Sequence, residues 1–403
     1  MEARSAAART SAARPAWIAG LVPLAALAVA IGLFIAFDAP GIDRTGVPAE
    51  ELAIERTVLH PGQIELHVRN DGADPVRVRQ MIVNDGYVAF TQSDDDLGRL
   101  QGAEIDADYP WIEGQDYEVV LLTSTGATID HTIEAASETP DADLGFYGLM
   151  LLIGVYVGVI PVAIGMLWLP WLRGIDPRWV RFLLALTVGL LAFLAVEALL
   201  EGSELAGDGP EAFGGAALVW LGAAGAYLAL AGVDGWLRGR RERAEADGGG
   251  RAGGLGYHAA FLVALGIGLH NLGEGLAIGS AYAIGSLALG AALVVGFALH
   301  NTTEGLAIVA PVAEGEVRWR RLAALGLLAG APAILGAWIG ASAYDPSLAA
   351  LMFGIGAGAI AQVIVQIAPG VRDSAGRLLH PLAAAGALTG LVLMYLTGLL
   401  VAI

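Results

Sequence analysis

From about residue 144 to its end the chain carries eight long apolar segments, and this feature limits its possible folds more than any other. Each segment is long enough to cross a hydrocarbon core of roughly 30 Å as a helix. Hydrophobic residues make up 56% of the 403 residues, which is more than a water-soluble surface usually allows. The sequence therefore predicts a multi-pass α-helical membrane protein. The approximate spans are 144–170, 180–201, 213–236, 257–281, 285–310, 319–343, 347–369 and 381–402.

Charge divides the chain into two compositional regimes. Residues 38–143 hold 23 acidic residues and 6 arginines, whereas the rest of the chain holds 17 acidic residues and 16 arginines. Within 38–143, short alternating runs such as 63–69 and 117–122 are bounded by turn residues. We therefore expect a small, acidic, all-β sandwich domain of six or seven strands over 38–143, followed by an eight-helix domain over 144–403.

An N-terminal segment precedes both domains. Arg4, Arg9 and Arg14 stand before an apolar run from about Trp17 to Phe37. A basic region before an apolar run is typical of a signal sequence. Because no clear cleavage site follows the run, we expect residues 1–37 to form a cytoplasmic N-terminus and a retained signal-anchor helix.

The distribution of arginine predicts the orientation. Cytoplasmic loops of membrane proteins are rich in basic residues, and here the arginines gather in alternate loops, at 171–181, 237–256, 313–321 and 370–380. The loops between them carry acidic residues and no arginine. We therefore expect a protein of the cell membrane whose β domain and C-terminus lie outside the cytoplasm. We expect the apolar helices to lie in the lipid bilayer, and we expect no nucleic acid partner.

One motif is repeated on two consecutive apolar segments. The skeleton Leu-His-Asn-x-x-Glu-Gly-Leu-Ala-Ile occurs twice, 30 residues apart, on helices that must run antiparallel. His270 and Glu274 are four residues apart and so share one helix face, as do His300 and Glu304. Both motifs lie near the middle of their spans. A pseudo-two-fold axis between the helices would bring two imidazoles and two carboxylates together at the membrane midplane.

These residue types fit a metal site. Ionisable groups at this depth are costly, and they persist when they are paired, hydrated or bound to metal. Nitrogen and oxygen donors suit Zn²⁺, Fe²⁺ and Mn²⁺, whereas the absence of cysteine excludes thiolate sites. Asn271 and Asn301 help to line the same side. The alternative interpretation is polar residues that hydrogen-bond helix to helix. The repetition of two carboxylates favours the metal site.

On these residues the chain resembles the ZIP (zinc/iron-regulated transporter-like) metal transporters, near their bacterial broad-specificity branch. The resemblance covers about residues 144–403 and leaves the anchor and the β domain uncovered. It implies an eight-helix bundle with a divalent metal ion such as zinc, iron or manganese as transported substrate, and a homodimer. It also implies a first metal site made by His270, Glu274, His300 and Glu304. At a second site, Asn271 and Asn301 would join the two glutamates.

At the expected second site, two positions depart from the family pattern. Ala333 stands where the sixth helix usually offers a glutamate, and Gln366 stands where the seventh helix often carries one. The second site is therefore depleted of charge. We expect it to bind metal weakly or not at all.

The expected function is uptake of a divalent metal ion toward the cytoplasm, without enzymatic activity. The sequence contains neither the zinc-peptidase pattern His-Glu-x-x-His nor the phosphate-binding pattern Gly-x₄-Gly-Lys-Ser/Thr. The alternative is a non-transporting metal sensor or receptor that uses the outer β domain.

Several further polar residues have both a metal-related and a structural interpretation. Three pairs lie in or beside the apolar segments, namely Glu197 with Glu201, Asp234 with His258, and Gln362 with Gln366. In the β domain, His60, His67 and His131 stand among many acids. The three pairs either contact the transported ion or are polar groups at helix ends and between helices. The residues of the β domain either collect cations or belong to an acidic surface that keeps the domain soluble.

Overall fold

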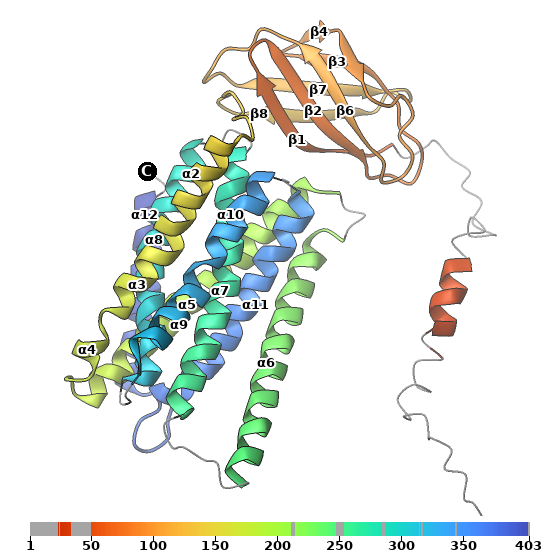
Figure 1. Ribbon diagram of the computed structural model, residues 1–403. Coiled ribbons are helices and arrows are strands. Elements are labelled where there is room, and N and C mark those ends of the chain that lie inside the picture. The colour runs from red at the N-terminus through yellow and green to blue at the C-terminus, as the bar shows by residue number, and fades with distance from the viewer. Residues whose placement is uncertain are drawn as a thin grey trace, which may run out of the picture. The chain divides into compact units, whose positions relative to one another are not determined.

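Figure 1 shows the computed structural model of the chain, which describes Pro23, Ala25–Leu33 and residues 50–401 apart from 211–213, 247–253, 284–286, 314, 316 and 343–344. The chain divides into two compact units, Met1–Pro48 and Ala49–Ile403. In the first unit, Pro23 and Ala25–Leu33 are helical. The rest of the predicted N-terminus and signal-anchor helix, residues 1–37, lies outside the described residues.

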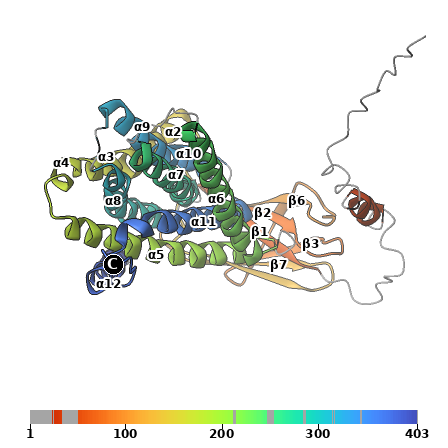
Figure 2. The same cartoon turned by 90° about the horizontal axis from the view of Figure 1, so that it is seen from below.

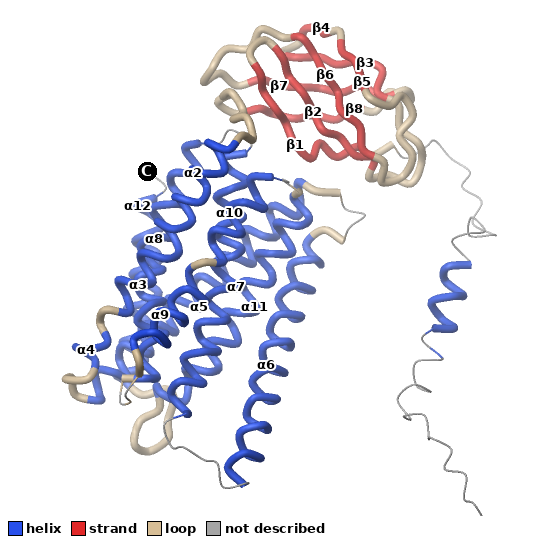
Figure 3. The backbone as a smooth tube through the Cα atoms, viewed as in Figure 1, coloured by secondary structure: helices blue, strands red, loops and turns tan. Residues whose placement is uncertain are grey.

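The second unit begins with eight strands in two antiparallel sheets (Figure 3). The first sheet has the order β1-β2-β6-β5 and contains β1 (Leu52–His60), β2 (Gln63–Asn70), β6 (Gly102–Asp108) and β5 (Phe90–Gln92). The second sheet has the order β4-β3-β7-β8 and contains β4 (Gly86–Val88), β3 (Val78–Val83), β7 (Tyr117–Thr123) and β8 (Thr128–Ile133).

Alternation along the strands explains how the two sheets share a core. In β2, Ile64, Leu66 and Val68 are almost fully buried, whereas the residues between them stay partly exposed. Met81 and Val119 of the second sheet belong to the same buried cluster. The prediction of β structure before the helices is confirmed as two small antiparallel sheets. The strand count of six or seven is too low, because β4 and β5 have three residues each and are too short to show a period of two.

The remainder of the second unit is helical. Its first apolar segment is interrupted, and it contains α2 (Leu144–Gly154), a π-helical turn (Val155–Val159), α3 (Ile160–Met166) and α4 (Leu169–Leu172). The following elements are α5 (Pro177–Asp208), α6 (Ala216–Ala246), α7 (Gly254–Ala283), α8 (Leu287–Val309), a 3₁₀ turn (Ala310–Val312), α9 (Trp319–Gly330), α10 (Pro332–Ser342), α11 (Pro346–Val371) and α12 (Pro381–Val401).

Seven helical segments are long and apolar enough to cross a membrane, and they match the first seven predicted spans. They are Leu144–Leu172, Pro177–Gly207, Ala216–Arg240, Gly256–Ala283, Leu293–Val312, Trp319–Ser342 and Pro346–Val371. The eighth predicted span, 381–402, forms α12, whose described apolar stretch, Pro381–Leu396, is shorter. Length and composition therefore fit a membrane-embedded protein.

Loops that were predicted to share one side of the membrane meet at one end of the bundle. Arg173, after α4, donates from Nη2 to the carbonyl of Gly315, which precedes α9, at 2.8 Å. Arg321 of α9 lies over the ring of Tyr257 at the start of α7, 5.3 Å from the ring centroid. This is the arginine-rich end of the bundle. Helix α7 begins there, and α8 and α11 end there.

The contacts divide the helices into two groups, which can be followed in Figure 2. In the first group α7 packs on α8, α9 and α10, α8 packs on α3, and α10 packs on α2. In the second group α11 packs on α5 and α6, and α12 packs on α5. The two groups are packed together, because α7 contacts α11 more extensively than it contacts α8 or α9.

Both copies of the repeated motif pack against a neighbour in the same way. Gly275 of α7 lies so close to the Ala333 carbonyl of α10 that a Cβ there would collide with it. Gly305, the same motif position on α8, has the same relation to the Val162 carbonyl of α3. The equivalent contacts are those that the predicted pseudo-two-fold axis requires.

This packing predicts the effect of adding one methyl group. We expect Gly305→Ala to lose folded protein or to unfold at a clearly lower temperature, because the Val162 carbonyl leaves no room for a Cβ. Gly232→Ala in α6 is a matched control, since a Cβ there meets nothing within 4 Å and alanine is favoured over glycine in a helix by about 1 kcal/mol. Thermal unfolding of both variants in detergent measures the difference. Equal unfolding temperatures would contradict the close approach of α8 and α3.

Candidate metal centre

The two His/Glu pairs lie in the middle of α7 and α8, inside the bundle. His270 and Glu274 are one turn apart on α7, and His300 and Glu304 are one turn apart on α8. The exposed fractions of the four residues are 5%, 2%, 4% and 1%, in that order. All four are therefore buried by other helices and are turned away from the surroundings of the bundle.

The Glu274 carboxylate links the two motifs. Its Oε1 lies 2.9 Å from Nε2 of His270 on the same helix and 2.5 Å from Nε2 of His300 on the neighbouring helix. Its Oε2 accepts a hydrogen bond from Nδ2 of Asn301 at 3.1 Å. One carboxylate is thus hydrogen-bonded to His300 and Asn301 and lies in ion-pair contact with His270. These charge-assisted bonds offset much of the cost of burying it.

Three of the predicted residues have the spacing of metal ligands. One donor atom from each of His270, Glu274 and His300 lies within 4.8 Å of the other two. The centroids of the two imidazole rings are 6.2 Å apart. A divalent ion with bonds of about 2.0–2.2 Å to nitrogen and oxygen fits between such donors after small side-chain movements. The cluster can therefore hold a metal ion, and it can also exist as a hydrogen-bonded network.

Glu304 is buried beside this cluster without joining it. It does not share the 4.8 Å spacing with the other three residues, and neither of its carboxylate oxygens has a hydrogen-bond partner in the described part of the chain. A buried carboxylate without partners is costly. The four-residue set predicted from the sequence is therefore three converging residues and one buried, unpartnered acid.

The Asn301 side chain is held by an irregularity in the helix that it touches. Its Nδ2 donates to the Val157 carbonyl at 3.0 Å. In a regular α-helix this carbonyl would accept from residue 161, but that residue is Pro161, which has no N–H. Val157 lies inside the π-helical turn over Val155–Val159, where the regular hydrogen-bond pattern of the helix is interrupted. The amide of Asn301 therefore satisfies a carbonyl that the broken helix leaves free.

Asn271 makes the equivalent contact on the other side. Its Nδ2 donates at 3.0 Å to the carbonyl of Ala329, in the last turn of α9. The last carbonyls of a helix lack partners within that helix, and Pro332 begins the next one. In both asparagines the amide nitrogen is thus fixed, and Oδ1 is buried without a described partner.

These carbonyls were not identified from the sequence. The available signal was proline, because Pro161 and Pro332 interrupt the two apolar segments that pack against the motif helices. Ala333, where a family glutamate was expected, is fully buried and lies beside Gly158 and Gly275. The second site therefore has the free oxygens of the two asparagines and of Glu304, and no acid from α10.

The second helix group places Glu197 of α5 within electrostatic range of His270, Glu274 and His300. Gly356 of α11 faces His270, and a Cβ added there would lie 3.3 Å from Nδ1. Gln362 is 3% exposed and Gln366 is half-buried, and Oε1 of each lacks a described partner. Glu197 and Glu201 are exposed on α5.

The Asp234 and His258 pair lies apart from the cluster. Asp234 lies 3.3 Å from Nε2 of His258 and accepts from Nε of Arg238 at 2.9 Å. An arginine that already pairs with the carboxylate fits the interpretation of a polar group at a helix end.

Comparison with protein-family models and with curated proteins finds no match to this chain. The functional argument therefore rests on the site itself. A buried cluster of two imidazoles and one carboxylate, with a second carboxylate nearby, is compatible with metal binding.

The role of Pro161 predicts the effect of removing it. In Pro161→Ala the restored N–H can bond to the Val157 carbonyl within the first apolar segment, so Asn301 keeps only Glu274 as acceptor and is oriented less firmly toward it. Because partners that orient a ligand typically contribute 10–100-fold to metal affinity, we expect Zn²⁺ binding to weaken about 10-fold. Calorimetric titration of the purified protein with Zn²⁺ measures this affinity.

Pro177→Ala is the matched control for this experiment. Pro177 stands at the start of α5, where a backbone N–H has no helix partner in any case. The account of Asn301 is wrong if the two proline variants bind Zn²⁺ equally well.

Proposed function

We propose that this chain is a membrane transporter that takes up a divalent transition-metal ion through the His/Glu cluster between α7 and α8. The observation that carries the proposal is the convergence of His270, Glu274 and His300, with donor atoms within 4.8 Å of one another, in the buried middle of two apolar helices. Ionisable side chains in the middle of a membrane cost free energy, and where they occur they usually mark an ion or substrate pathway.

Charge and donor type favour a divalent ion such as zinc, iron or manganese. Glu274 and Glu304 together carry two negative charges when ionised, and the ion would neutralise both. Imidazole nitrogen and carboxylate oxygen suit these three ions. The unpartnered oxygens of Glu304, Asn271 and Asn301 would serve a second, weaker position beside the first. The metal is the substrate in this proposal, and no covalent chemistry is required of the chain.

The repeated motif supports a ZIP-like bundle as the finer description of the fold. In that description α12 is the eighth membrane helix, and the β domain and C-terminus face outward. The shared end of the arginine-bearing loops, where Arg173 meets Gly315, would face the cytoplasm. A homodimer in the cell membrane is part of the same proposal.

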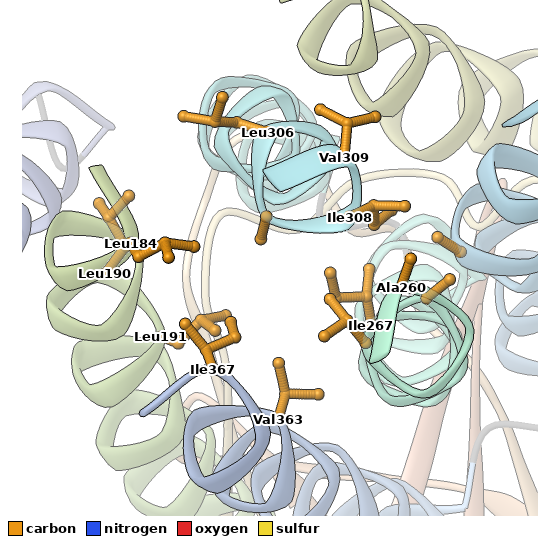
Figure 4. Close-up of a cluster of buried hydrophobic side chains, with 14 of the residues drawn as sticks. Leu184, Leu190, Leu191, Ala260, Ile267, Leu306, Ile308, Val309, Val363 and Ile367 are labelled. Carbon is orange, nitrogen blue, oxygen red and sulfur yellow. The ribbon is translucent and has the colours of Figure 1, made fainter. Parts of the chain in front are cut away.

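The two helix groups offer a route for alternating access. The hydrogen-bonded cluster belongs to the first group, and the second group covers it with mainly small and apolar side chains. On the arginine-rich side of the cluster, Leu191, Ile267, Ile308, Val363 and Ile367 converge from α5, α7, α8 and α11 (Figure 4). This apolar layer would block a hydrated ion. In the proposed cycle the ion loses water to the imidazoles and carboxylates, and the groups then move apart at the layer to release it.

Metal accumulation in cells tests the proposal. Replacing His300 by Ala or Glu274 by Gln removes a donor from the cluster, so we expect uptake of Zn²⁺, Fe²⁺ or Mn²⁺ to fall at least 10-fold at equal membrane expression. The double variant His270→Ala/Glu304→Ala should abolish it. His380→Ala is the control, because His380 lies at the start of α12 and contacts the Val371 carbonyl. Undiminished uptake in the cluster variants would refute transport through this site.

A further inference from the structure

The described residues contain one other group with metal-ligand spacing, and it lies on the β domain. Donor atoms of Glu65, His67 and Glu104 all lie within 4.8 Å of one another. This group shares no residue with the cluster between α7 and α8. The sequence had singled out His67 only as one of three histidines in an acidic domain.

The sheet itself brings the three side chains together. In β2, Glu65 and His67 are two residues apart, so they project from the same face. That face points away from the core, which takes Ile64, Leu66 and Val68. In the register of β2 and β6, His67 stands directly opposite Glu104. Facing pairs on neighbouring strands lie within reach of each other's side chains.

The distances place the imidazole between two carboxylates. Nε2 of His67 lies 2.7 Å from Oε1 of Glu65, and Nδ1 lies 4.0 Å from Oε1 of Glu104. The side chains of His67, Glu65 and Glu104 are 31%, 23% and 59% exposed, respectively. Water can therefore reach the group and complete the coordination of an ion held by these three donors.

Charge around the group favours a cation on balance. Two carboxylates close together repel each other unless a positive charge lies between them, and a neutral imidazole supplies none. Asp106 and Asp108 follow Glu104 on the same strand, and the whole segment 38–143 holds 23 acidic residues against 6 arginines. Arg56 stands opposite His67 on β1. Its positive charge repels a cation, so the site binds a metal ion more weakly than it would without this arginine.

We propose that Glu65, His67 and Glu104 form a further divalent-metal site, on the face of the β1-β2-β6-β5 sheet that points away from the core between the sheets, and that it binds the same class of ion as the transport path. The proposal rests on the proposed function only for the class of ion. The site raises the amount of metal held by the outer domain when metal is scarce, and it shares no residue with the His/Glu cluster between α7 and α8.

Zinc titration of the purified full-length protein tests the site. The starting variant is Glu274→Gln/His300→Ala, which lacks two donors of the buried cluster, so Zn²⁺ bound by it reports the remaining sites. We expect it to retain the Zn²⁺ site of the β domain. Adding His67→Asn or Glu104→Gln should weaken that site at least 10-fold. Glu104 is the most exposed of the three, so its substitution leaves the core of the domain intact.

Two matched controls separate this site from general acidity. His60→Asn changes another histidine of the same sheet, and Asp108→Asn removes one negative charge from the same strand as Glu104. Both should leave the Zn²⁺ affinity of the starting variant unchanged. The proposal is overturned if His67→Asn binds Zn²⁺ as tightly as His60→Asn, or if all these variants weaken binding equally, which would mean a diffuse acidic surface.

Measuring Zn²⁺ uptake by the same variant distinguishes the surface site from the transport proposal. In the otherwise unchanged chain, His67→Asn should transport Zn²⁺ normally when the ion is saturating and more slowly when it is limiting. Transport that survives loss of the buried cluster would refute the proposed function and leave the titration result standing. Normal uptake by His67→Asn at both concentrations would overturn the collecting role of the surface site.

Discussion

The Glu274 carboxylate between the imidazoles of His270 and His300 is the interaction on which the rest of the bundle depends. A charged group at the centre of an apolar bundle is costly, and here its cost is offset by hydrogen bonds to His300 and Asn301 and by the close contact with the His270 imidazole. The carboxylate reaches its partners only because α7 and α8 lie side by side at matching depth. Glycines at equivalent positions, Gly275 and Gly305, allow their neighbours to approach closely enough to hold them there.

In this site the polar atoms that have hydrogen-bond partners serve helix packing, and the polar atoms that lack partners are suited to ion binding. The amide nitrogens of Asn271 and Asn301 bond to carbonyls at helix interruptions, as packing residues do. Their oxygens and both oxygens of Glu304 have no described partner, although buried polar atoms in native proteins nearly always have one. Acceptor oxygens that remain free next to two imidazoles suit a cation. This is the physical reason for preferring a transport path to a purely structural network.

Much of this arrangement could be predicted from the sequence, since it depends on regular spacing. Four-residue spacing placed His270 with Glu274, and the repeat placed His300 opposite them. Spacing along ideal helices could not predict that Glu304 remains apart, because side-chain direction and helix interruption decide it. Pro161 lacks the backbone N–H that a regular α-helix needs, and a π-helical turn lies just before it. A hydropathy pattern does not show this interruption, because proline does not change the apolar character of the segment. Strands of three residues, β4 and β5, are too short to show alternation.

The central claim is that two imidazoles and at least one carboxylate bind a common ion, and zinc X-ray absorption spectroscopy tests it most directly. The sample is the full-length protein carrying His67→Asn, so that zinc on the β domain does not contribute. The account predicts two imidazole nitrogens and carboxylate oxygen at about 2.0–2.2 Å from zinc, with one imidazole lost in His300→Ala. Zinc coordinated by oxygen alone, or a spectrum unchanged by His300→Ala, would contradict it.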